Sequence, residues 1–381
     1  MDSSRYLPHP FGKISWDRLG NWDYPYFLPE FIPRKLNLDE ATYQELTIAE
    51  RELGRLSGAT SNAKDFDLLT GAYSLIESLN SSQIEGTQST LDEVMSNEIP
   101  LEEIQSLDLR EVMNYRSALE LGQSMLRELP LTQRLFLALQ KELLSGVRGQ
   151  ERAPGEIRQS PVWVGTGNGP AEARFIPPLP HHIGDLLADW EKFVNEPNQE
   201  LVLWLALSHY QFETIHPLLD GNGRIGRILI ELQLVNQGIL PRPALGISSY
   251  FERHRAEYYQ RLQAVRETGD IGNWIGFFAR AVADRARASR LMLLDFGQLR
   301  EKYLEILPRP ELVDALLQYP ITTVSRVQKL LGVSQPTAAS YLDRARQLGL
   351  VELVGTSGRG AKQTFVATEA WAILQAHQSE N

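Results

Sequence analysis

The stretch His216-Pro217-Leu218-Leu219-Asp220-Gly221-Asn222-Gly223-Arg224-Ile225-Gly226-Arg227 joins two apolar segments whose spacing predicts helices, Leu201 to Ile215 before it and Ile225 to Leu234 after it. Its Gly-Asn-Gly turn opens the second helix, so backbone N–H groups there have no partner within the helix and point outward. The dipole of that helix adds positive potential at the same end, and such an end binds anions. The stretch therefore predicts a phosphate-binding turn between two helices.

The charged side chains of this stretch fit the same chemistry. Arg224 and Arg227 lie three residues apart on one helix, so both guanidiniums can reach one anion. Asp220 faces this positive region, which suits a Mg²⁺ ion shared with phosphate oxygens. His216 ends the preceding helix, and an imidazole with a pKa near ~6.5 is largely available as a base at pH 7. The residues predict a nucleotide-phosphate site with a general base at its rim.

The same residues resemble the signature of the Fic family, in which His-Pro-Phe precedes an acidic residue, Gly-Asn-Gly-Arg and a second Arg. Leu218 stands where the family usually has Phe, and it keeps the apolar character of that position. Fic proteins generally transfer AMP from ATP to a hydroxyl of a target protein, so the resemblance implies a protein adenylyltransferase that uses ATP and Mg²⁺. It implies His216 as the catalytic base, Asp220 as the metal ligand, and as phosphate-binding residues Gly221, Asn222, Gly223, Arg224 and Arg227.

A second motif lies upstream, where a segment of helical pattern runs into Ser81-Ser82-Gln83-Ile84-Glu85-Gly86. Taken alone, Glu85 is one more surface carboxylate. Ser81 with Glu85-Gly86 resembles the inhibitory-helix motif of Fic proteins, a Ser or Thr followed four residues later by Glu and then Gly or Asn. The resemblance implies that Glu85 holds Arg227 in a bidentate pair, so that this arginine cannot grip the γ-phosphate. The α-phosphate of bound ATP would then not be aligned for in-line attack.

Two short β-prone runs flank Gly165-Thr166-Gly167-Asn168-Gly169 and predict a hairpin. In Fic proteins the equivalent hairpin is the flap beside the active site, which pairs with the target segment by adding a strand. We carry this role over to about Ser160 to Phe175, with Val162, Val164 and Gly165 as its contact residues. The implied partner is a protein that presents a Tyr, Thr or Ser hydroxyl on an extended segment.

The pair Tyr258-Tyr259 resembles a Tyr-Tyr segment of the family in which an aromatic ring lines the adenine pocket. We assign this contact to Tyr258, and core packing is an equal contender for either tyrosine.

The chain divides into three regions. Residues 1–110 form an N-terminal arm and a helical region with the inhibitory motif, residues 111–300 the Fic catalytic domain, and residues 308–381 a separate domain. In the last region two helices at 323–331 and 337–349 and two β-prone runs outline a winged helix, similar to the C-terminal winged domains of some Fic proteins. The expected fold is mainly α: a Fic-type helical bundle with a β-hairpin flap, plus a C-terminal winged-helix domain.

The winged helix could contact DNA or protein. Its second helix would offer polar side chains to a DNA groove, namely Gln335, Thr337, Ser340, Tyr341 and Arg344. From residue 308 onward, however, seven Lys or Arg stand against six Asp or Glu, a poor electrostatic footprint for DNA. DNA binding therefore stays open, and contact with another protein is at least as well supported.

Composition sets the broad class. The chain has 381 residues, enough for two or three domains, and its net charge of −10 argues against a nonspecific nucleic-acid coat. It has no cysteine, which excludes disulfides and thiolate metal sites. The first residues lack an apolar signal core, and no apolar run approaches the ~20 residues that span a bilayer. We expect a soluble cytoplasmic protein without membrane contact, and a homodimer is left open.

Two other sites fit parts of the motif. Gly221-Asn222-Gly223-Arg224-Ile225-Gly226 matches the dinucleotide fingerprint, but that fingerprint needs a preceding strand, and here a helical pattern precedes it. His209, Glu213 and His216 lie at helical spacing and could present a metal triad, although Gly-Asn-Gly-Arg has no role in zinc hydrolysis. We expect His209 to be a packed or hydrogen-bonded core residue.

Two other functions remain as alternatives to AMP transfer. One is a nucleotide-sensing, DNA-binding transcriptional regulator in which the phosphate site only senses its ligand. The other is transfer of a different phosphate-bearing group, because the motif binds phosphates rather than the base and a few Fic relatives use other donors.

Overall fold

The protein is known from a computed structural model, which describes residues 1–17, 20–60, 63–97, 101–165, 169–196, 200–355 and 363–379. Helices dominate this described part: α1 (Glu40–Thr60), α2 (Ala63–Ile84), α3 (Leu91–Ser96), α4 (Leu107–Met125), α5 (Gln133–Leu143), α6 (Pro180–Asn195), α7 (Leu201–Ile215), α8 (Asn222–Asn236), α9 (Ser248–Arg253), α10 (Arg255–Thr268), α11 (Ile271–Ile306), α12 (Pro310–Gln318), α13 (Val324–Leu331), α14 (Gln335–Gln347) and α15 (Thr368–Ser379). The strands are short: β1 (Gly12–Ser15), β2 (Tyr26–Pro29), β3 (Ile321–Thr323), β4 (Glu352–Gly355) and β5 (Thr364–Val366). The expected mainly helical fold is confirmed.

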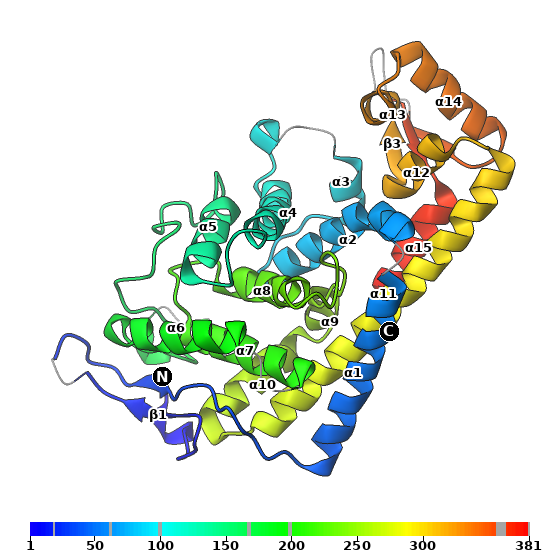
Figure 1. Ribbon diagram of the computed structural model, residues 1–381. Coiled ribbons are helices and arrows are strands. Elements are labelled where there is room, and N and C mark those ends of the chain that lie inside the picture. Colours follow the sequence, from blue (N-terminus) through cyan, green and yellow to red (C-terminus); the bar gives the residue numbers. More distant parts are fainter. Residues whose placement is uncertain are drawn as a thin grey trace.

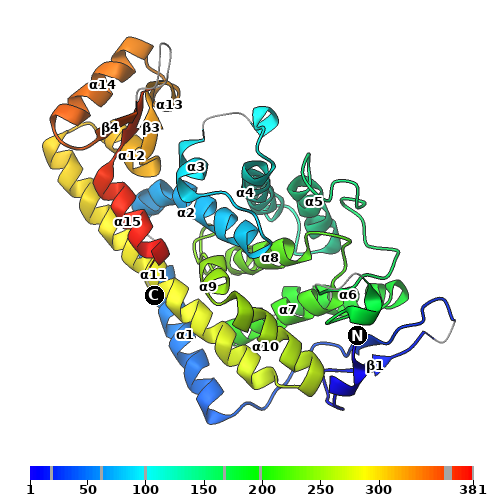
Figure 2. The same ribbon diagram turned by 180° about the vertical axis from the view of Figure 1, so that it is seen from behind.

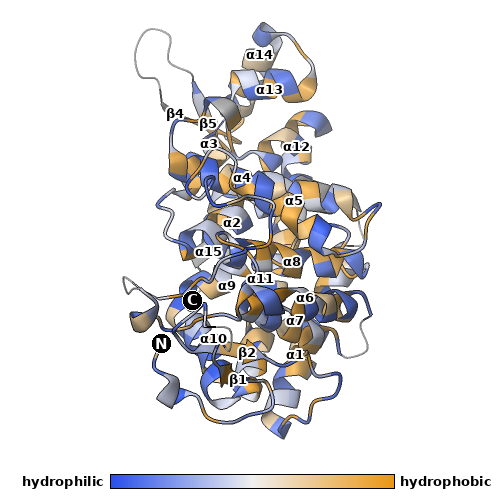
Figure 3. Ribbon diagram, turned by 90° about the vertical axis from the view of Figure 1, so that its left-hand side faces the viewer, coloured by the Kyte–Doolittle hydropathy of each residue, from blue (hydrophilic) through white to orange (hydrophobic). Residues whose placement is uncertain are grey.

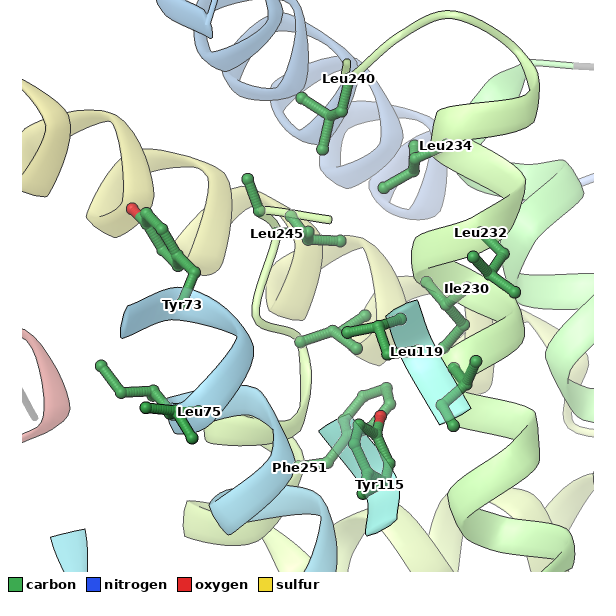
Figure 4. Close-up of a cluster of buried hydrophobic side chains, with 14 of the residues drawn as sticks. Tyr73, Leu75, Tyr115, Leu119, Ile230, Leu232, Leu234, Leu240, Leu245 and Phe251 are labelled. Carbon is green, nitrogen blue, oxygen red and sulfur yellow. The ribbon is translucent and has the colours of Figure 1, made fainter. Parts of the chain in front are cut away.

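The core is built around α7 and α8, the two helices on either side of the motif. Every residue of α7 from Val202 to Ile215 is buried, as in a helix that is apolar on all sides and lies inside a protein. Helices α2, α4, α5, α6 and α11 pack around this pair. Figure 4 shows part of this core, formed by Tyr73 and Leu75 of α2, Tyr115 and Leu119 of α4, Ile230, Leu232 and Leu234 of α8, and Leu240, Leu245 and Phe251 beyond it.

The outer helices are amphipathic. In α5 the buried positions include Leu135, Phe136, Leu139 and Leu143, at the spacing that places them on one face. Figure 3 shows the mixture of hydrophobic and hydrophilic residues along such surface helices. Thr132 is the N-cap residue of α5, where the sequence predicts a helix start.

The long helix α11 runs along one side of the molecule (Figures 1 and 2). It spans 36 residues, with α1 beside one part of it and α15 beside another. The sequence pattern over 274–294 predicts a helix, and in the structure this segment is part of the longer α11. It is continuous across residue 300, and the proposed domain boundaries stay predictions.

The sequence pattern from Arg242 to Gly269 predicts a helix, and this prediction is wrong for its first residues, because α9 begins at Ser248. The backbone N–H groups of Ala244, Leu245 and Gly246 donate instead to the buried carboxylate of Glu231. A side chain that satisfies three amides holds this segment as a loop.

The N-terminal arm is extended, as predicted, and its two strands pair. β1 and β2 are antiparallel, with Gly12 opposite Pro29 and Ser15 opposite Tyr26. The arm packs against the returning chain of the flap region: the N–H of Phe27 donates to the carbonyl of Ile176 at 2.9 Å.

The C-terminal region has the element order expected of a winged helix. β3 precedes the helices α13 and α14, and β4 and β5 follow, in a sheet of order β3-β5-β4 with antiparallel neighbours. Gly332, with φ 63°, ends α13, and the Ser334 side chain caps α14. The predicted glycine-rich connection falls mostly on residues 356–362, outside the described residues. The three-residue strand β3 is too short to be recognised from sequence.

Two buried carboxylates link α2 to the loop after α8. Glu77 accepts hydrogen bonds from the Tyr115 hydroxyl at 3.1 Å and from the backbone N–H and hydroxyl of Ser248. Burial raises the pKa of Glu77, and the nearby carboxylate of Glu231 raises it further. An acid with a raised folded-state pKa keeps its proton in the folded chain and loses it in the unfolded chain. Stability therefore falls as pH rises from the unfolded pKa, about 4.3, toward the folded pKa.

Replacing Glu77 by Gln, which mimics the protonated acid, is expected to flatten this dependence. The slope of the unfolding free energy should lose about 1.4 kcal/mol per pH unit within this window. Urea unfolding between pH 5 and 8 measures it. Glu120→Gln is the matched control, because that side chain is 55% exposed and pairs with Arg116 at the surface. An unchanged slope in Glu77→Gln would show that Glu77 is ionised in the folded chain.

Candidate functional site

His216 ends α7 in the left-handed conformation, with φ 50° and ψ 60°. Its N–H donates to the carbonyl of Phe212 at 3.0 Å, which closes the helix. A non-glycine residue in this conformation is strained, and such strain gathers at functional sites. The left-handed conformation of His216 turns the chain after α7 toward the start of α8.

The loop between the helices is shaped by Asn222. Its side chain accepts from the N–H of Leu218 and donates to the carbonyl of Leu218, both at 2.9 Å. Leu218 itself is fully buried, so leucine serves as the apolar anchor at this position. Since the Asn222 amide is engaged with the loop, any contact of Asn222 with phosphate falls to its backbone N–H.

The start of α8 is an anion-binding end. Gly221 precedes it with φ 83°, and the first N–H to bond within the helix is that of Ile225, to the Gly221 carbonyl at 3.0 Å. The N–H groups of Asn222, Gly223 and Arg224 therefore lack intrahelical partners. Together with the helix dipole they favour a negative group at this point.

Glu85 forms an ion pair with Arg227, an arginine in the first turns of α8. Its Oε1 lies 2.7 Å from Nη2 of Arg227, whose side chain is completely buried. Ser81 holds the same guanidinium: its hydroxyl accepts from Nε at 2.8 Å and its carbonyl from Nη2 at 2.9 Å. Burial by itself would raise the pKa of Glu85, but the charge and hydrogen bond of Arg227 lower it below the usual value. Glu85 follows α2 directly, and Gly86 continues with φ 102°.

Gly223 leaves room for this carboxylate. A Cβ at Gly223 would lie 2.5 Å from Oε1 of Glu85 and 3.0 Å from Nη1 of Arg227. A glycine is needed here because the carboxylate, and any group that replaces it, approaches the backbone of α8.

At this site three guanidinium nitrogens are buried without a hydrogen-bond partner among the described residues: Nη1 of Arg227, and Nε and Nη1 of Arg224. Buried donors of this kind are costly unless an acceptor joins them. Asp220 is the nearest carboxylate to Arg224, at 3.6 Å from Nη2. These donors are the strongest sign that the site is built for an anion with several oxygens.

A cavity of about 520 Å³ opens over Arg227. Its lining includes several predicted site residues: Glu85, Val164, Gly165, His216, Gly223, Arg227 and Tyr258. Other predicted residues do not line it: Ser81, Val162, Asp220, Gly221, Asn222 and Arg224. Ser81 acts through the side chain of Arg227, which it holds, and Asn222 acts through the loop between α7 and α8, which it shapes.

The predicted flap is present as a single pairing. The N–H of Val164 donates to the carbonyl of Phe175 at 2.8 Å, and Phe175 donates back at 3.1 Å. The turn residues 166–168 lie outside the described residues. The short 3-10 helix Pro170–Glu172 follows. The described part of the flap therefore has less β-structure than the sequence predicts.

Tyr258 is both core and cavity wall. It is fully buried, and its hydroxyl is bonded to Nε2 of His209 at 2.9 Å. Tyr259 lines the same cavity and is half-buried. Nδ1 of His209 contacts the Gly226 carbonyl at 3.2 Å, so His209 is a hydrogen-bonded core residue, as predicted. Among the residues that the structure describes, no cluster of three His, Asp or Glu could hold a metal ion.

The titration of the site is shaped by burial and by arginines. Burial, Arg158 and Arg266 lower the pKa of His216 to about 3, so its imidazole is neutral across the physiological range. Glu213 lies one turn before His216 on α7, and burial raises the pKa of Glu213 to about 7. The imidazole of His216 is therefore in its proton-accepting form, and its pKa lies below the value near ~6.5 that the sequence predicts, which makes it a weaker base.

The sequence assigned no role at the phosphate site to three residues that the structure places beside it. Arg266 donates to the Glu213 carbonyl and to the Thr214 hydroxyl and lies 3.9 Å over the Phe175 ring. Arg158 bonds to the His216 carbonyl, and Glu213 lines the cavity. Isolated arginines in a helix or loop carry no local signal, whereas the spacing of Glu213 three residues before His216 did place it near the site, as part of a possible metal triad.

A Mg²⁺ ion would find one carboxylate here. The Asp220 side chain is 36% exposed and stands at the mouth of the α8 anion site. Magnesium is commonly held by one or two carboxylates plus phosphate oxygens and waters, so a single aspartate fits this use.

The fold and site define a helical protein with a phosphate-binding turn, an imidazole at its rim and a carboxylate seated on its arginine. Residues 43–124 match the sequence model described as Fic/DOC family N-terminal, and residues 130–234 match that of the Fic/DOC family. These two regions of the chain are thus similar to the N-terminal and main domains of the Fic/DOC family.

Curated relatives carry the name protein adenylyltransferase Fic. The one from Drosophila grimshawi is 32% identical over 184 residues, which is 46% of this chain and 32% of the relative. The one from Aedes aegypti is 34% identical over 128 residues, 33% of this chain and 23% of the relative. The chain thus spans about a third of the length of the Drosophila grimshawi relative and a smaller share of the Aedes aegypti relative.

Solved structures share the fold. A Fic family protein from Desulfovibrio desulfuricans G20 has a TM-score of 0.54 at 19% identity, over 87% of this chain and 97% of that one. Fic-1 from C. elegans has a TM-score of 0.52 at 20% identity, over 68% of this chain and 74% of that one. In the described residues no helix is long and apolar enough to cross a membrane.

Proposed function

We propose that this protein is an adenylyltransferase that moves AMP from ATP to a Tyr, Thr or Ser hydroxyl of a target protein and of the chain itself. The observation that carries the proposal is the placement of Glu85 on Arg227 inside the cavity that also holds His216. A carboxylate here fills the place that a phosphate would take, so the site is built for a nucleotide and is restrained by its own chain.

ATP binds with its phosphates over the N–H groups of Gly221 to Arg224. Arg224 and Arg227 offer their unpaired N–H groups to the β- and γ-phosphate oxygens. Asp220 would hold Mg²⁺, which neutralises phosphate charge and helps to orient the chain of phosphates. Tyr258 forms part of the wall on which the adenine rests.

The transfer is an in-line displacement at the α-phosphorus. The flap, with Val162, Val164 and Gly165, pairs with an extended target segment and brings its hydroxyl to the α-phosphate. The hydroxyl oxygen forms a bond to phosphorus while His216 takes the proton. The bond from phosphorus to the bridging oxygen breaks, and pyrophosphate leaves with that electron pair.

Glu85 restrains this reaction by holding Arg227 away from the γ-phosphate. ATP that binds beside the occupied arginine places its α-phosphate out of line. The sequence resemblance and the 2.7 Å pair support this role together.

The names of the relatives support AMP transfer over a nucleotide-sensing transcriptional regulator. Transfer from another phosphate-bearing donor remains an alternative, because the α8 turn binds phosphates and not the base.

The test uses ATP labelled at either of two positions. The full chain carrying Glu85→Gly is incubated with Mg²⁺ and ATP labelled at the α-phosphate or at the γ-phosphate, alone and with a cell lysate. AMP transfer puts the α-label, and not the γ-label, on protein. Label from the γ-position, or no label from either, would refute the proposal, and competition by unlabelled GTP or UTP identifies another donor.

The remaining assignments stay predictions: a winged helix that contacts DNA or protein, a homodimer, and a cytoplasmic location. A gel shift with genomic fragments at several salt concentrations tests the first, since specific DNA binding depends steeply on salt.

A further inference from the structure

Arg158 is a buried cation that lies beside the catalytic turn. Its side chain is among the largest that are fully buried, with 1% of the residue exposed. Its guanidinium donates to backbone carbonyls: Nε to His216 at 2.8 Å, Nη2 to Ile215 at 3.3 Å and to Pro178, and Nη1 to Ser160 at 3.2 Å. Its own N–H donates to Pro217 at 3.0 Å.

The carbonyls at the end of α7 explain why this charge is stable in the interior. The last carbonyls of a helix have no intrahelical partners and carry the negative end of the dipole. A planar guanidinium can satisfy several of them at once. Burial lowers the pKa of Arg158 to about 10, so the group remains charged at neutral pH.

The acceptors of Arg158 belong to three different segments. Ile215 and His216 end α7, Ser160 stands where the flap begins, and Pro178 stands just after the flap returns. One rigid side chain thus ties both ends of the flap to the residue that carries the catalytic imidazole.

We propose that Arg158 is a positioning residue that sets the separation between the flap and His216 and so determines how closely the target hydroxyl meets its base. The inference rests on the proposed transfer, in which the flap holds the hydroxyl. A displacement of about 1 Å between reacting groups can cost about a hundredfold in rate.

The charge of Arg158 also acts on the imidazole. Arg158 and Arg266 both lower the pKa of His216, and the carboxylate of Glu85 acts in the opposite direction. Glu213, one turn earlier on α7, lies in the same cavity. Removing the charge of Arg158 should therefore raise the pKa of His216, and a purely structural residue would not move this pKa.

The phosphate site does not depend on Arg158. The α8 turn is held by Asn222 and Leu218, and Arg227 is held by Ser81 and Glu85. ATP affinity should therefore survive changes at Arg158.

The experiment compares Arg158→Lys, which keeps the charge and loses the planar fork, with Arg158→Gln, which loses both. Both are made in the full chain with Glu85→Gly. Arg152→Gln is the matched control, because the Arg152 side chain is 58% exposed and forms an ion pair with neighbouring Glu151. We measure the single-turnover rate of self-labelling against pH, ATP affinity, Tm, and hydrogen exchange over residues 160–178.

Both Arg158 variants should label about a hundredfold more slowly, with ATP affinity within about twofold of the control. Hydrogen exchange at the ends of the flap should be faster in both. Only Arg158→Gln should raise the pKa of His216, which is measured by NMR titration of the imidazole. Equal loss of rate, ATP affinity and Tm, or an unchanged pKa of His216 in Arg158→Gln, would overturn the positioning role.

If the Glu85→Gly chain labels nothing, the proposed function fails, and this inference is still decided by the other readouts. The pKa of His216 measured by NMR should rise in Arg158→Gln, and flap exchange should quicken in both variants. No change in either measurement would refute the tie between the flap and His216.

Discussion

Replacing His216 by alanine in the Glu85→Gly chain is expected to slow AMP transfer by about 10²–10⁴-fold, the usual contribution of a general base. The imidazole stands at the left-handed end of α7 and lines the cavity, where a hydroxyl can reach it. Its low pKa keeps it neutral, so the loss should be similar from pH 6 to 8. ATP affinity should change little, because the α8 turn and the arginines hold the phosphates.

The rate is measured by transfer of the α-phosphate label, and ATP affinity is measured in parallel. His181→Ala is the matched control, since His181 is exposed on α6, and it should label at the parent rate. Undiminished labelling by the His216 variant would assign the proton transfer to another group.

Glu85→Gly is expected to raise labelling about tenfold or more over the natural chain. A hydrogen bond between charged groups contributes about 1.5–3 kcal/mol, and each 1.4 kcal/mol is a factor of ten. Glu85 is 35% exposed on its side chain, which places the effect toward the lower end. Freed from Glu85, Arg227 has the γ-phosphate as its partner.

Gln88→Gly is the matched control, because Gln88 is exposed in the same segment and is replaced by the same residue. It should leave labelling unchanged. A Glu85→Gly chain no faster than the natural one would remove Glu85 from the inhibitory role, while equal activation by Gln88→Gly would assign the effect to loosening of the segment.

Local patterns predicted the secondary structure where the chain satisfies its own backbone. The glycine turn begins α8, because a turn depends on a few neighbouring residues. The helix expected from Arg242 failed to start there for the opposite reason. The amides of that loop are satisfied by Glu231, which belongs to another element, and no local pattern reveals such a partner.

The candidate site was predictable in part. The motif from His216 to Arg227 contains the base and the phosphate turn within twelve residues, so their nearness follows from chain connectivity. Arg158 was not predictable, because its acceptors are carbonyls of three segments and any residue type supplies a carbonyl.

By itself the sequence determined the phosphate turn, its arginines and the apolar helices on both sides, since these depend on spacing along one short stretch. It pointed to Glu85 and the flap only through resemblance to a family. The tertiary structure decided that Glu85 meets Arg227 across 142 residues of chain, and that Arg158 ties the flap to His216. Such contacts arise from the packing of distant elements around a shared core, and burial then sets which donors and acceptors must pair.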